Sequence, residues 1–588
     1  MKTIGVKLNS IAAAQKAALL ILFILLAAFS AHASYADDAD SVTREALVDS
    51  FVKAACLEEG IGGDTLSGFI DADNVGEKYK KSMETAVSMG LLKGSLTDEG
   101  AKLMASEKVS RLEALVLLSR FLPESSKSEV EASITNAPSW ASEALNSLPE
   151  YVFDPNTGRN SSDLKGYISS SELLRYSEIL ASAWACLGTL SHEGYTLEKA
   201  VVLSRHNIRS PLSWSGSVLD RLTPYSWHEW SSNPGELSLR GGILETQMGQ
   251  YFRKWLEDEG LFPENYIPEG DAVRIYSNSK QRTIATANYF SSGLLPAAGI
   301  SVEHHGEFDS MDPVFLPGLG FCTDSYSEAV INEIESSFSK SIEELSDNYK
   351  LLSEVVDLEN SEAYKNGEAE AFKQGDMEVT LEEGKEPAMT GSLKTACSLA
   401  DALVLQYYEE SDPLKASFNT PLTLEEWKDI SDIKDVYVNV LYTAPSLSVN
   451  LAHPLLQEIR SELAEEERSF SFLCGHDSNV SSALSALKVE DYSLPGAIER
   501  NTSIGCKVVF SLWKAPDGEE YLSTDLVYQT SWQLHDMPLL SLENPPAIYH
   551  LSFSGLSQNE DGLYASSEFM ESLDSAISEY DELKIRYR

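Results

Sequence analysis

The chain has 588 residues, which is too many for a single hydrophobic core and predicts several domains. Its formal net charge is −46 and 43% of its residues are hydrophobic, so the composition indicates a folded acidic protein and disfavours nucleic acid as a partner. Because salt screens distant charges within about 8 Å, this acidity does not exclude an anionic substrate that is bound by local arginines.

The first 36 residues resemble an export signal. Basic residues up to Lys16 precede an apolar run from Ala17 to Phe29, and the sequence Ala31-His32-Ala33 is typical of a cleavage site. This apolar run is short for a membrane span, so a retained anchor is the weaker alternative. We therefore expect an exported protein, either secreted or associated with the cell envelope.

The next segment, residues 37–190, is rich in helical patterns and repetitive. One repeat begins at Gly68-Phe69-Ile70-Asp71, passes through Gly90-Leu91-Leu92-Lys93-Gly94 and ends in a helix from Val109 to Leu122. Val42–Leu47 is similar to the second half of a preceding copy, and residues 140–184 are similar to a later copy that lacks the arginine of the motif. These motifs resemble S-layer homology repeats, which implies binding to cell-wall polymers. The alternative is a helical spacer that binds nothing.

A basic cluster follows the first strongly apolar strand of the region from residue 191 to 588. The run Val201–Ser204 predicts a buried strand, and it ends at Arg205-His206-Asn207-Ile208-Arg209-Ser210-Pro211. Open α/β sheets bind ligands at the carboxyl ends of their strands. Two arginines around a histidine offer planar donors for a phosphate beside a potential nucleophile. The pattern predicts phosphate chemistry, with a basic surface loop as the alternative.

Further α/β elements follow this cluster. The spacing predicts a helix over Gly241–Leu256, a strand over Val273–Ser277 and a helix over Ile284–Phe290. Arg282 lies near the start of the last helix, where backbone N–H groups suit an anion. We therefore group Arg282 with the two arginines of the first cluster.

A second polar cluster lies far downstream. Residues from about 318 to 445 contain long amphipathic helices, one of them predicted from Tyr326 to Leu352, and indicate an insertion over the sheet. After it, a predicted strand over Phe470–Cys474 leads to Gly475-His476-Asp477-Ser478-Asn479. We expect this histidine–aspartate pair to meet the first cluster.

Together, R-H-x-x-R-x-P and the later H-D pair resemble the histidine acid phosphatases, branch 2 of the histidine phosphatase superfamily, from about Glu198 to the C-terminus. The sequences R-H-N and H-D-S-N, with the segments Tyr276–Ala287 and Glu499–Trp513, are most similar to the bacterial glucose-1-phosphatases, with the periplasmic phytases as near relatives. The resemblance implies an α/β fold: a phosphoglycerate-mutase-like central sheet flanked by helices, with an inserted α-helical cap, preceded by a small all-α repeat domain.

The resemblance also implies a role for each site residue. His206 would be the nucleophile that takes the phosphoryl group, and Asp477 would donate a proton to the leaving alcohol. Because Asp477 can do so only in its acid form, we expect activity to favour acidic pH. No metal and no cofactor is implied. The residues that would hold the phosphate oxygens are Arg205, Arg209, Arg282 and His476.

For the substrate, we expect phosphomonoesters and favour sugar phosphates such as glucose 1-phosphate over phytate. Each further phosphate of phytate needs a cationic partner, yet only Arg221, Arg274 and Lys280 lie near the motifs. The loop Ser213-Trp214-Ser215-Gly216-Ser217 offers an aromatic ring and hydroxyls to a neutral sugar. The alternatives are a phytase and a wall-attached binding protein whose phosphatase domain is inactive.

Cysteines and the remaining histidines give weaker signals. Six cysteines are scattered without a C-x-x-C spacing, which argues against a zinc site and leaves disulfide pairing open. We interpret Cys474, at the end of an apolar strand, as a buried thiol. His304 and His305 have no third ligand at a useful spacing, so we interpret them as loop residues.

Overall fold

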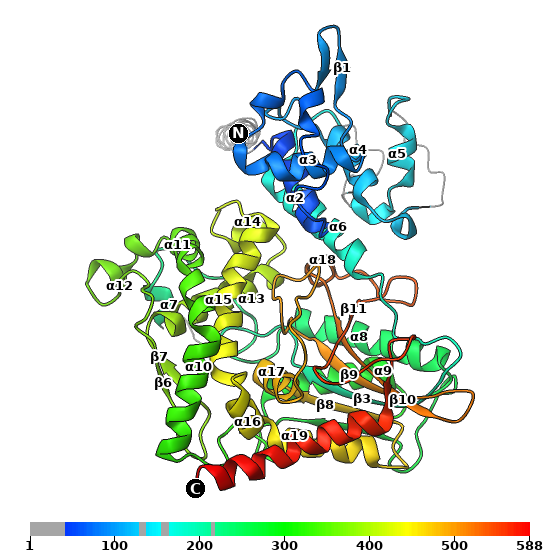
Figure 1. Ribbon diagram of the computed structural model, residues 1–588, viewed down its shortest axis with the longest axis vertical. Helices are drawn as coiled ribbons and strands as arrows, with labels where there is room; N and C mark the ends of the chain where they lie inside the picture. The colour runs from blue at the N-terminus through cyan, green and yellow to red at the C-terminus, as the bar shows by residue number, and fades with distance from the viewer. Residues whose placement is uncertain (1–40, 129–136, 154–163, 213–217) are drawn as a thin grey trace, which may run out of the picture. The chain divides into compact units, whose positions relative to one another are not determined.

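The computed structural model divides into two compact units, each described by itself below (Figure 1). The first unit comprises Met1–Val52, Leu57–Phe121 and Lys127–Leu173, and the second comprises Lys53–Cys56, Leu122–Ser126 and Leu174–Arg588. The predicted export signal and the loop 213–217 lie outside the described residues. No helix within the described residues is long and apolar enough to cross a membrane. The residues that the structure describes are 41–128, 137–153, 164–212 and 218–588.

Three copies of one backbone arrangement form the centre of the first unit. In each copy a short extended segment, centred on Val42, Val109 or Ile168, leads into a helix. The segments exchange backbone hydrogen bonds in a cycle: Val109 donates to Val42 (3.0 Å), Ile168 to Val109 (3.0 Å) and Val42 to Ile168 (3.3 Å). All three side chains are buried. The helices that follow are α2 (Arg44–Ala54), α4 (Arg111–Phe121) and α6 (Ser170–Ala185).

Arginine–glutamate pairs join successive copies of this arrangement. Arg44 Nη2 lies 2.6 Å from Glu113 Oε1, and Arg111 Nε lies 2.5 Å from Glu172 Oε1. Each glutamate also accepts the backbone N–H three residues before it, so it caps its own helix. The same carboxylate therefore stabilises a helix start and links that helix to the preceding copy.

We call each contact between neighbouring copies a joint. The third joint, between the copies centred on Ile168 and Val42, has neither the arginine nor the glutamate of this pair. Ser170 stands at the position of Arg44 and Arg111, and Ala46 stands at the position of the two glutamates.

Between α3 (Lys80–Ser88) and α4 the unit also contains a hairpin of β1 (Ser95–Thr97) and β2 (Gly100–Lys102). The predicted all-α description of this part is therefore wrong in this detail: the positive φ of Gly100 (135°) lets the chain turn back on itself. A short helix, α5 (Ser142–Ser147), follows α4.

An eight-stranded mixed sheet organises the second unit, which confirms the predicted α/β class (Figure 1). Its order is β11-β10-β9-β3-β8-β4-β5, with β12 paired to β10. The neighbours from β3 to β5 are parallel, and the other pairs are antiparallel. The strands are β3 (Thr196–Arg205), β4 (Val273–Ser277), β5 (Val302–Glu303), β8 (Phe470–Gly475), β9 (Lys507–Lys514), β10 (Glu520–Tyr528), β11 (Ala547–His550) and β12 (Tyr564–Ala565).

Helices cover both faces of this sheet, which is why β3 is apolar at consecutive positions (Figure 1). Val202 packs into a core shared with α8 and α9, whereas Val201 and Leu203 are equally buried and point the other way, where α16 and α17 contact β3. A Cβ on Gly249 or Gly293 would collide with the backbone of the facing helix, so α8 and α9 touch closely. These helices are α8 (Leu239–Asp258), α9 (Gln281–Leu294), α16 (Pro445–Ala464), α17 (Asp477–Ala486) and α19 (Ser566–Arg586).

A helical insertion follows β5, as the cap prediction expects. The single helix predicted over Tyr326–Leu352 is two helices that meet at Leu345, because Asp347 in the next turn favours a new helix start. Pro445 begins the helix that returns to the sheet. The elements of the insertion are α10 (Asp324–Glu344), α11 (Ser346–Val355), α12 (Glu362–Lys365), β6 (Glu378–Thr380), β7 (Ala388–Thr390), α13 (Ser392–Glu409), α14 (Pro413–Ala416) and α15 (Leu424–Tyr442).

The six cysteines, all of them described, are free thiols. Cys474 is buried in β8, which confirms its interpretation as a buried thiol. His305 lies in a loop, where its Nδ1 is 3.2 Å from the Tyr276 hydroxyl.

Candidate active site

Three parallel strands end at one level and bring the two sequence motifs together. Arg205, the last residue of β3, pairs with Gly475 of β8, and Ser277 of β4 pairs with Cys474. The backbone N–H of His206 donates to Gly475 O (3.0 Å). The ring centroids of His206 and His476 are 5.4 Å apart. The sequence motifs therefore share one site at the carboxyl edge of the sheet, as predicted.

Among the described residues, only one nitrogen of the His206 imidazole has a hydrogen-bond partner. Its Nδ1 lies 2.9 Å from the carbonyl oxygen of Asn207, which can only accept, so Nδ1 carries the proton and Nε2 keeps its lone pair. Burial, together with the positive charge of Arg282, holds the pKa of His206 well below its ordinary value. The neutral form of the ring is therefore favoured, and this is the form that a nucleophile needs.

Asn207 anchors this loop to a buried ion pair that the sequence did not reveal. Its amide donates to Glu245 Oε2 (2.8 Å), and Glu245 Oε1 lies 2.8 Å from Lys507 Nζ. Glu245 and Lys507 are both fully buried. Opposite the loop, a Cβ on Gly505 would lie 2.5 Å from the Asn207 amide. The sequence feature that could have revealed this ion pair is Glu245 itself, a glutamate on the buried face of an amphipathic helix.

His476 is oriented by an asparagine that sequence reasoning also missed. Asn278 Oδ1 accepts the backbone N–H groups of Ser279 (2.7 Å) and Asp312 (2.8 Å), which fixes the amide, and its Nδ2 donates to His476 Nε2 (2.7 Å). The other ring nitrogen, Nδ1, lies 3.4 Å from Arg282 Nη2. The ring therefore presents Nδ1 to the space beside the Arg282 guanidinium.

Three guanidinium groups have unused hydrogen-bonding capacity. The Nε atoms of Arg205, Arg209 and Arg282 are buried and have no hydrogen-bond partner among the described residues. A buried donor without a partner costs free energy, so such donors indicate a site for an acceptor. An anion with several oxygens between the three side chains satisfies them together.

The three arginines differ in their counterions. Arg205 Nη1 lies 2.7 Å from Glu499, and Arg209 Nη2 lies 3.0 Å from Asp401. For Arg282, no carboxylate of the described residues lies within 4 Å; burial and the charge of Arg209 lower its pKa to about 10. A phosphate would supply the missing negative charge and relieve the repulsion between Arg209 and Arg282.

Asp401 and Glu499 also share Lys434, and none of these three residues was predicted. Lys434 Nζ lies 2.7 Å from Glu499 Oε1 and 3.4 Å from Asp401 Oδ1. Asp401 belongs to α13 and Lys434 to α15, so two cap helices reach Arg209 and the Arg205–Glu499 pair. Charged residues flanked by buried apolar ones, as Lys434 follows Ile433, were the signal that could have revealed them.

Asp477 is the first residue of α17 and lies beside these cations. Its Oδ2 is 3.5 Å from Arg205 Nη2 and 3.7 Å from Lys434 Nζ. Burial raises the pKa of Asp477, but Arg205 and Lys434 outweigh burial, so the pKa lies well below its ordinary value. In the site without phosphate, these two cations therefore stabilise the carboxylate form of Asp477.

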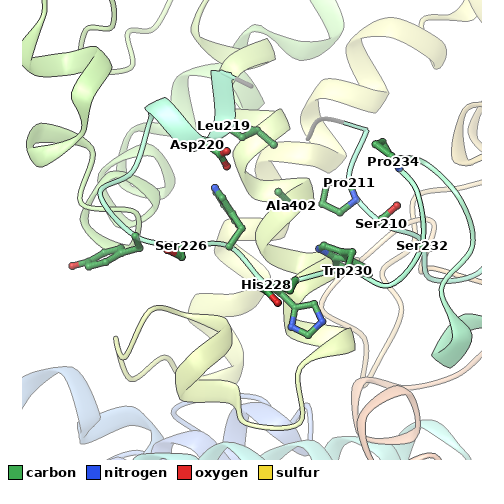
Figure 2. Close-up of a pocket in the computed structure, with 13 residues that line it drawn as sticks. Ser210, Pro211, Leu219, Asp220, Ser226, His228, Trp230, Ser232, Pro234 and Ala402 are labelled. Carbon is green, nitrogen blue, oxygen red and sulfur yellow. The ribbon is translucent and has the colours of Figure 1, made fainter. Parts of the chain in front are cut away.

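A pocket of about 660 Å³ adjoins the site (Figure 2). Ser210 and Pro211 follow Arg209 directly, and Ala402 follows Asp401 on α13. None of the six predicted site residues lines the pocket. Figure 2 shows Ser210, Pro211 and Pro234 at one side of it, Leu219 and Asp220 at another, and His228 and Trp230 near its base. Its wall combines aromatic rings, an imidazole and carboxylates, without a lysine or arginine.

Comparison with known proteins identifies the class. Residues 196–525 match the histidine phosphatase superfamily (branch 2). Glucose-1-phosphatase of Salmonella typhimurium is 34% identical over 381 residues, which cover 64% of this chain and 92% of that protein. The Escherichia coli phytase AppA is 25% identical over 401 residues, covering 65% of this chain and 92% of its own length. The solved Hafnia alvei phytase, 26% identical, superposes with a TM-score of 0.60 over 66% of this chain and 98% of its own.

The chain belongs to the histidine phosphatase superfamily, branch 2. It is a phosphatase that hydrolyses phosphomonoesters, and the part that matches its relatives is the second unit. Among the described residues, no group of three or more metal-ligating side chains is placed to hold a metal ion.

Proposed function

We propose that this phosphatase works through a phosphohistidine on His206. The Nε2 lone pair attacks phosphorus, the P–N bond forms, and the bond to the ester oxygen breaks. Water then attacks the phosphohistidine and releases phosphate. The observation that carries this proposal is the neutral His206 ring with a free Nε2. The guanidinium groups around it match the charge on the transferred phosphoryl oxygens.

Asp477 is the proton donor to the leaving oxygen in this proposal, and it takes a proton back from the attacking water. In the site without phosphate, its proton is lost because of Arg205 and Lys434. A bound phosphoryl group brings negative charge to the same cations and so raises the pKa of Asp477. Substrate binding and acidic pH therefore both favour the acid form, which gives an acidic pH optimum.

We further propose a preference for monophosphates of neutral sugars over phytate. Each basic residue noted near the motifs has a carboxylate within 4 Å: Arg221 pairs with Glu368, Arg274 with Glu303, and Lys280 with Asp309. They are poorly placed to hold additional phosphates. The similarity to glucose-1-phosphatase supports the same preference.

Acidic groups near the leaving-group side support this preference. Burial and the Asp477 charge raise the pKa of Glu386, whereas Lys280 and Arg282 lower it, so its carboxylate shares their surroundings. The pocket beside Arg209 has acidic and aromatic walls that suit hydroxyl groups and C–H faces of a sugar ring. In the pocket, a polyphosphate would meet the carboxylates of Asp220 and Glu229.

Two measurements test these proposals. Rapid mixing with substrate, an alkaline quench and peptide mass spectrometry should find phosphate on His206 and none in His206→Ala, because phosphohistidine survives alkali. The values of kcat/KM for glucose 1-phosphate and phytate at one acidic pH decide the substrate. A tenfold advantage for phytate, about 1.4 kcal/mol of transition-state preference, would establish the phytase alternative.

We also propose that the protein is exported and that its first unit binds a cell-wall polymer. A groove of about 330 Å³ in this unit is lined by Lys93, Arg120 and Trp140, and also by Arg44, whose guanidinium pairs with Glu113. Basic side chains beside an aromatic ring suit an acidic polysaccharide. The S-layer homology-like repeats and the signal-like first 36 residues support the same placement.

Sedimentation of the full-length protein with purified cell walls tests the wall proposal. Lys93→Glu combined with Arg120→Glu should release the protein into the supernatant and leave phosphatase activity intact. Lys127→Glu in the same unit, outside the groove, is the control and should still sediment. Unchanged sedimentation of the double variant would assign the repeats to a spacer.

A further inference from the structure

The cap supplies a cation to the proposed acid. Lys434 is 5% exposed, and its Nζ lies within 4 Å of three carboxylates, those of Glu499, Asp401 and Asp477. Glu499 is the nearest, at 2.7 Å, and it also holds Arg205. Lys434 therefore connects the cap to the arginine and to the acid at once.

The two carboxylate oxygens of Asp477 have different kinds of contact. Its Oδ1 accepts the N–H of Ser478 at 2.9 Å, which fixes one oxygen at the start of α17. Its Oδ2 lies between Arg205 Nη2 (3.5 Å) and Lys434 Nζ (3.7 Å), and neither forms a close hydrogen bond with it. This oxygen is therefore held by charge and remains able to take and give a proton.

We propose that Lys434 is a positioning residue of the phosphatase reaction, which holds the Asp477 carboxylate and sets the pH range over which it carries its proton. This inference rests on the proposed role of Asp477. Two cations lie beside Asp477. Arg205 also pairs with Glu499 and is proposed to bind the phosphate, so only Lys434 can be replaced without removing a proposed phosphate ligand.

The sign of the effect follows from the charges around Asp477. Loss of the Lys434 charge removes a stabilising cation and leaves Asp401 and Glu499 nearby, so the pKa of Asp477 rises. The acid form then persists to higher pH, and the basic limb of the rate profile moves upward. The ionisable groups that face Asp477 are Arg205, Arg209, Arg282, Glu386, Cys397, Asp401, Lys434, Tyr437, Tyr442, His476, Glu499 and Cys506.

The test is the pH profile of kcat, which reports the enzyme with substrate bound, in Lys434→Met and Lys434→Gln. Glutamine is included because its amide can still donate to Glu499, which protects the fold. We expect the basic limb to shift upward by about one pH unit or more in both, with a lower maximal rate. Lys434→Arg keeps the charge and should keep the position of the limb.

Lys428→Met is the matched control. Lys428 lies on the same helix, is 8% exposed and pairs with a single carboxylate, that of Glu425 at 2.7 Å. This variant controls for the loss of a poorly exposed lysine from the same helix; it should lose less stability and should not move the limb. A limb that stays in place in folded Lys434→Gln, or that moves equally in Lys428→Met, overturns the inference.

Asp477→Asn separates this inference from the proposed function. If Asp477 is the acid, the variant should slow an alkyl phosphate far more than p-nitrophenyl phosphate, whose leaving group needs no proton. Adding Lys434→Met to Asp477→Asn should then cost little more. Equal losses for both esters would contradict the role of Asp477 itself, whereas a full additional loss in the double variant would contradict only that of Lys434.

Discussion

Both units of this protein contain arginines that pair with carboxylates, but the pairs have different roles. In the first unit the arginines lie where a short extended segment meets a helix, and in the second unit Arg205 and Arg209 lie where a strand meets a loop. In the first unit, Arg44 and Arg111 each have a glutamate from the next copy, and the pair completes a joint. In the second unit, Arg205 and Arg209 have carboxylates yet keep a buried Nε without a partner among the described residues, and no carboxylate of those residues lies within 4 Å of Arg282. The pairs of the first unit therefore complete joints, whereas those of the second unit leave donors for the proposed phosphate.

Burial separates the pairs energetically. The side chains of Arg111 and Glu172 are 29% and 27% exposed, whereas those of Arg205 and Glu499 are 1% and 2% exposed. Water screens the first pair, so it contributes about 0–1 kcal/mol. Breaking the second pair leaves a buried charge, which costs about 3–5 kcal/mol. Replacing the glutamate of each pair by alanine should therefore lower the free energy of unfolding by very different amounts.

Glu499→Ala should have the largest effect on stability. It leaves Arg205 and Lys434 buried without their nearest carboxylate, so we expect a loss of about 3–5 kcal/mol in the free energy of unfolding of the second unit. Hydrogen exchange measured separately on peptides of each unit reports this loss. A loss below 1 kcal/mol would mean that water or rearrangement compensates the two cations.

Arg282→Ala should divide activity from stability. Because Arg282 has no carboxylate partner, its removal relieves repulsion with Arg209 and should leave the unfolding free energy unchanged or slightly higher. The value of kcat/KM should fall by about 10²–10³ because the transition state loses a donor. Steady-state kinetics and thermal unfolding of the same sample give both values. Equal damage to stability would contradict the assignment of Arg282 to phosphate.

Acidification should act on the second unit alone. The sequence has no histidine between His32 and His192, whereas His206 and His476 are buried with lowered pKa values. Their unfolded forms take protons below about pH 6.5, so the stability that these two residues contribute is lost as pH falls through that value. His535 and His550 have raised pKa values, and burial raises the pKa of Asp429 to about 6 and that of Asp435 to about 7, so these groups take up protons in the folded state and offset part of this loss. Hydrogen exchange at pH 7 and pH 5 checks the difference, and added phosphate should reduce it.

Glu172→Ala should have a small effect. It removes the exposed pair with Arg111 and a helix cap, so we expect the first unit to lose about 1 kcal/mol and phosphatase activity to stay unchanged. Glu143→Ala in the same unit serves as a control for the loss of one negative charge. A loss comparable with that of Glu499→Ala would remove the distinction between the two kinds of pair.

The smallest expected effect is a gain. Ala46→Glu combined with Ser170→Arg supplies both partners of the third joint, and the pair should couple by about 0.5 kcal/mol in a double-mutant cycle. Each single variant gains nothing from the missing partner. Purely additive single effects would show that the third joint has a different geometry from the other two.

Sequence reasoning predicted the catalytic half well because its signals are local. An apolar strand that ends at Arg205 and His206, and another that ends at His476, place both motifs at one sheet edge, and the structure brings them together. The predictions were weaker where partners come from distant segments. Asp401, Lys434 and Glu499 look like ordinary helix and loop charges until α13 and α15 fold over the sheet.

The protonation state of Asp477 shows the same limit. It depends on the distances to Arg205 and Lys434, which no pattern along the chain contains. The helix predicted over Tyr326–Leu352 was too long for a related reason, since a buried Leu345 fits the periodicity of either one helix or two.

The incomplete third joint also has a mechanical consequence. The joint between Ile168 and Val42 lacks the ion pair of the other two, and its backbone hydrogen bond is the longest of the cycle, at 3.3 Å against 3.0 Å. If the first unit is tethered to a wall and pulled, this joint has one arginine–glutamate contact fewer than each of the other two to resist the load. Ala46 and Ser170, which replace the glutamate and the arginine, therefore determine which joint has the weaker side-chain contact under load.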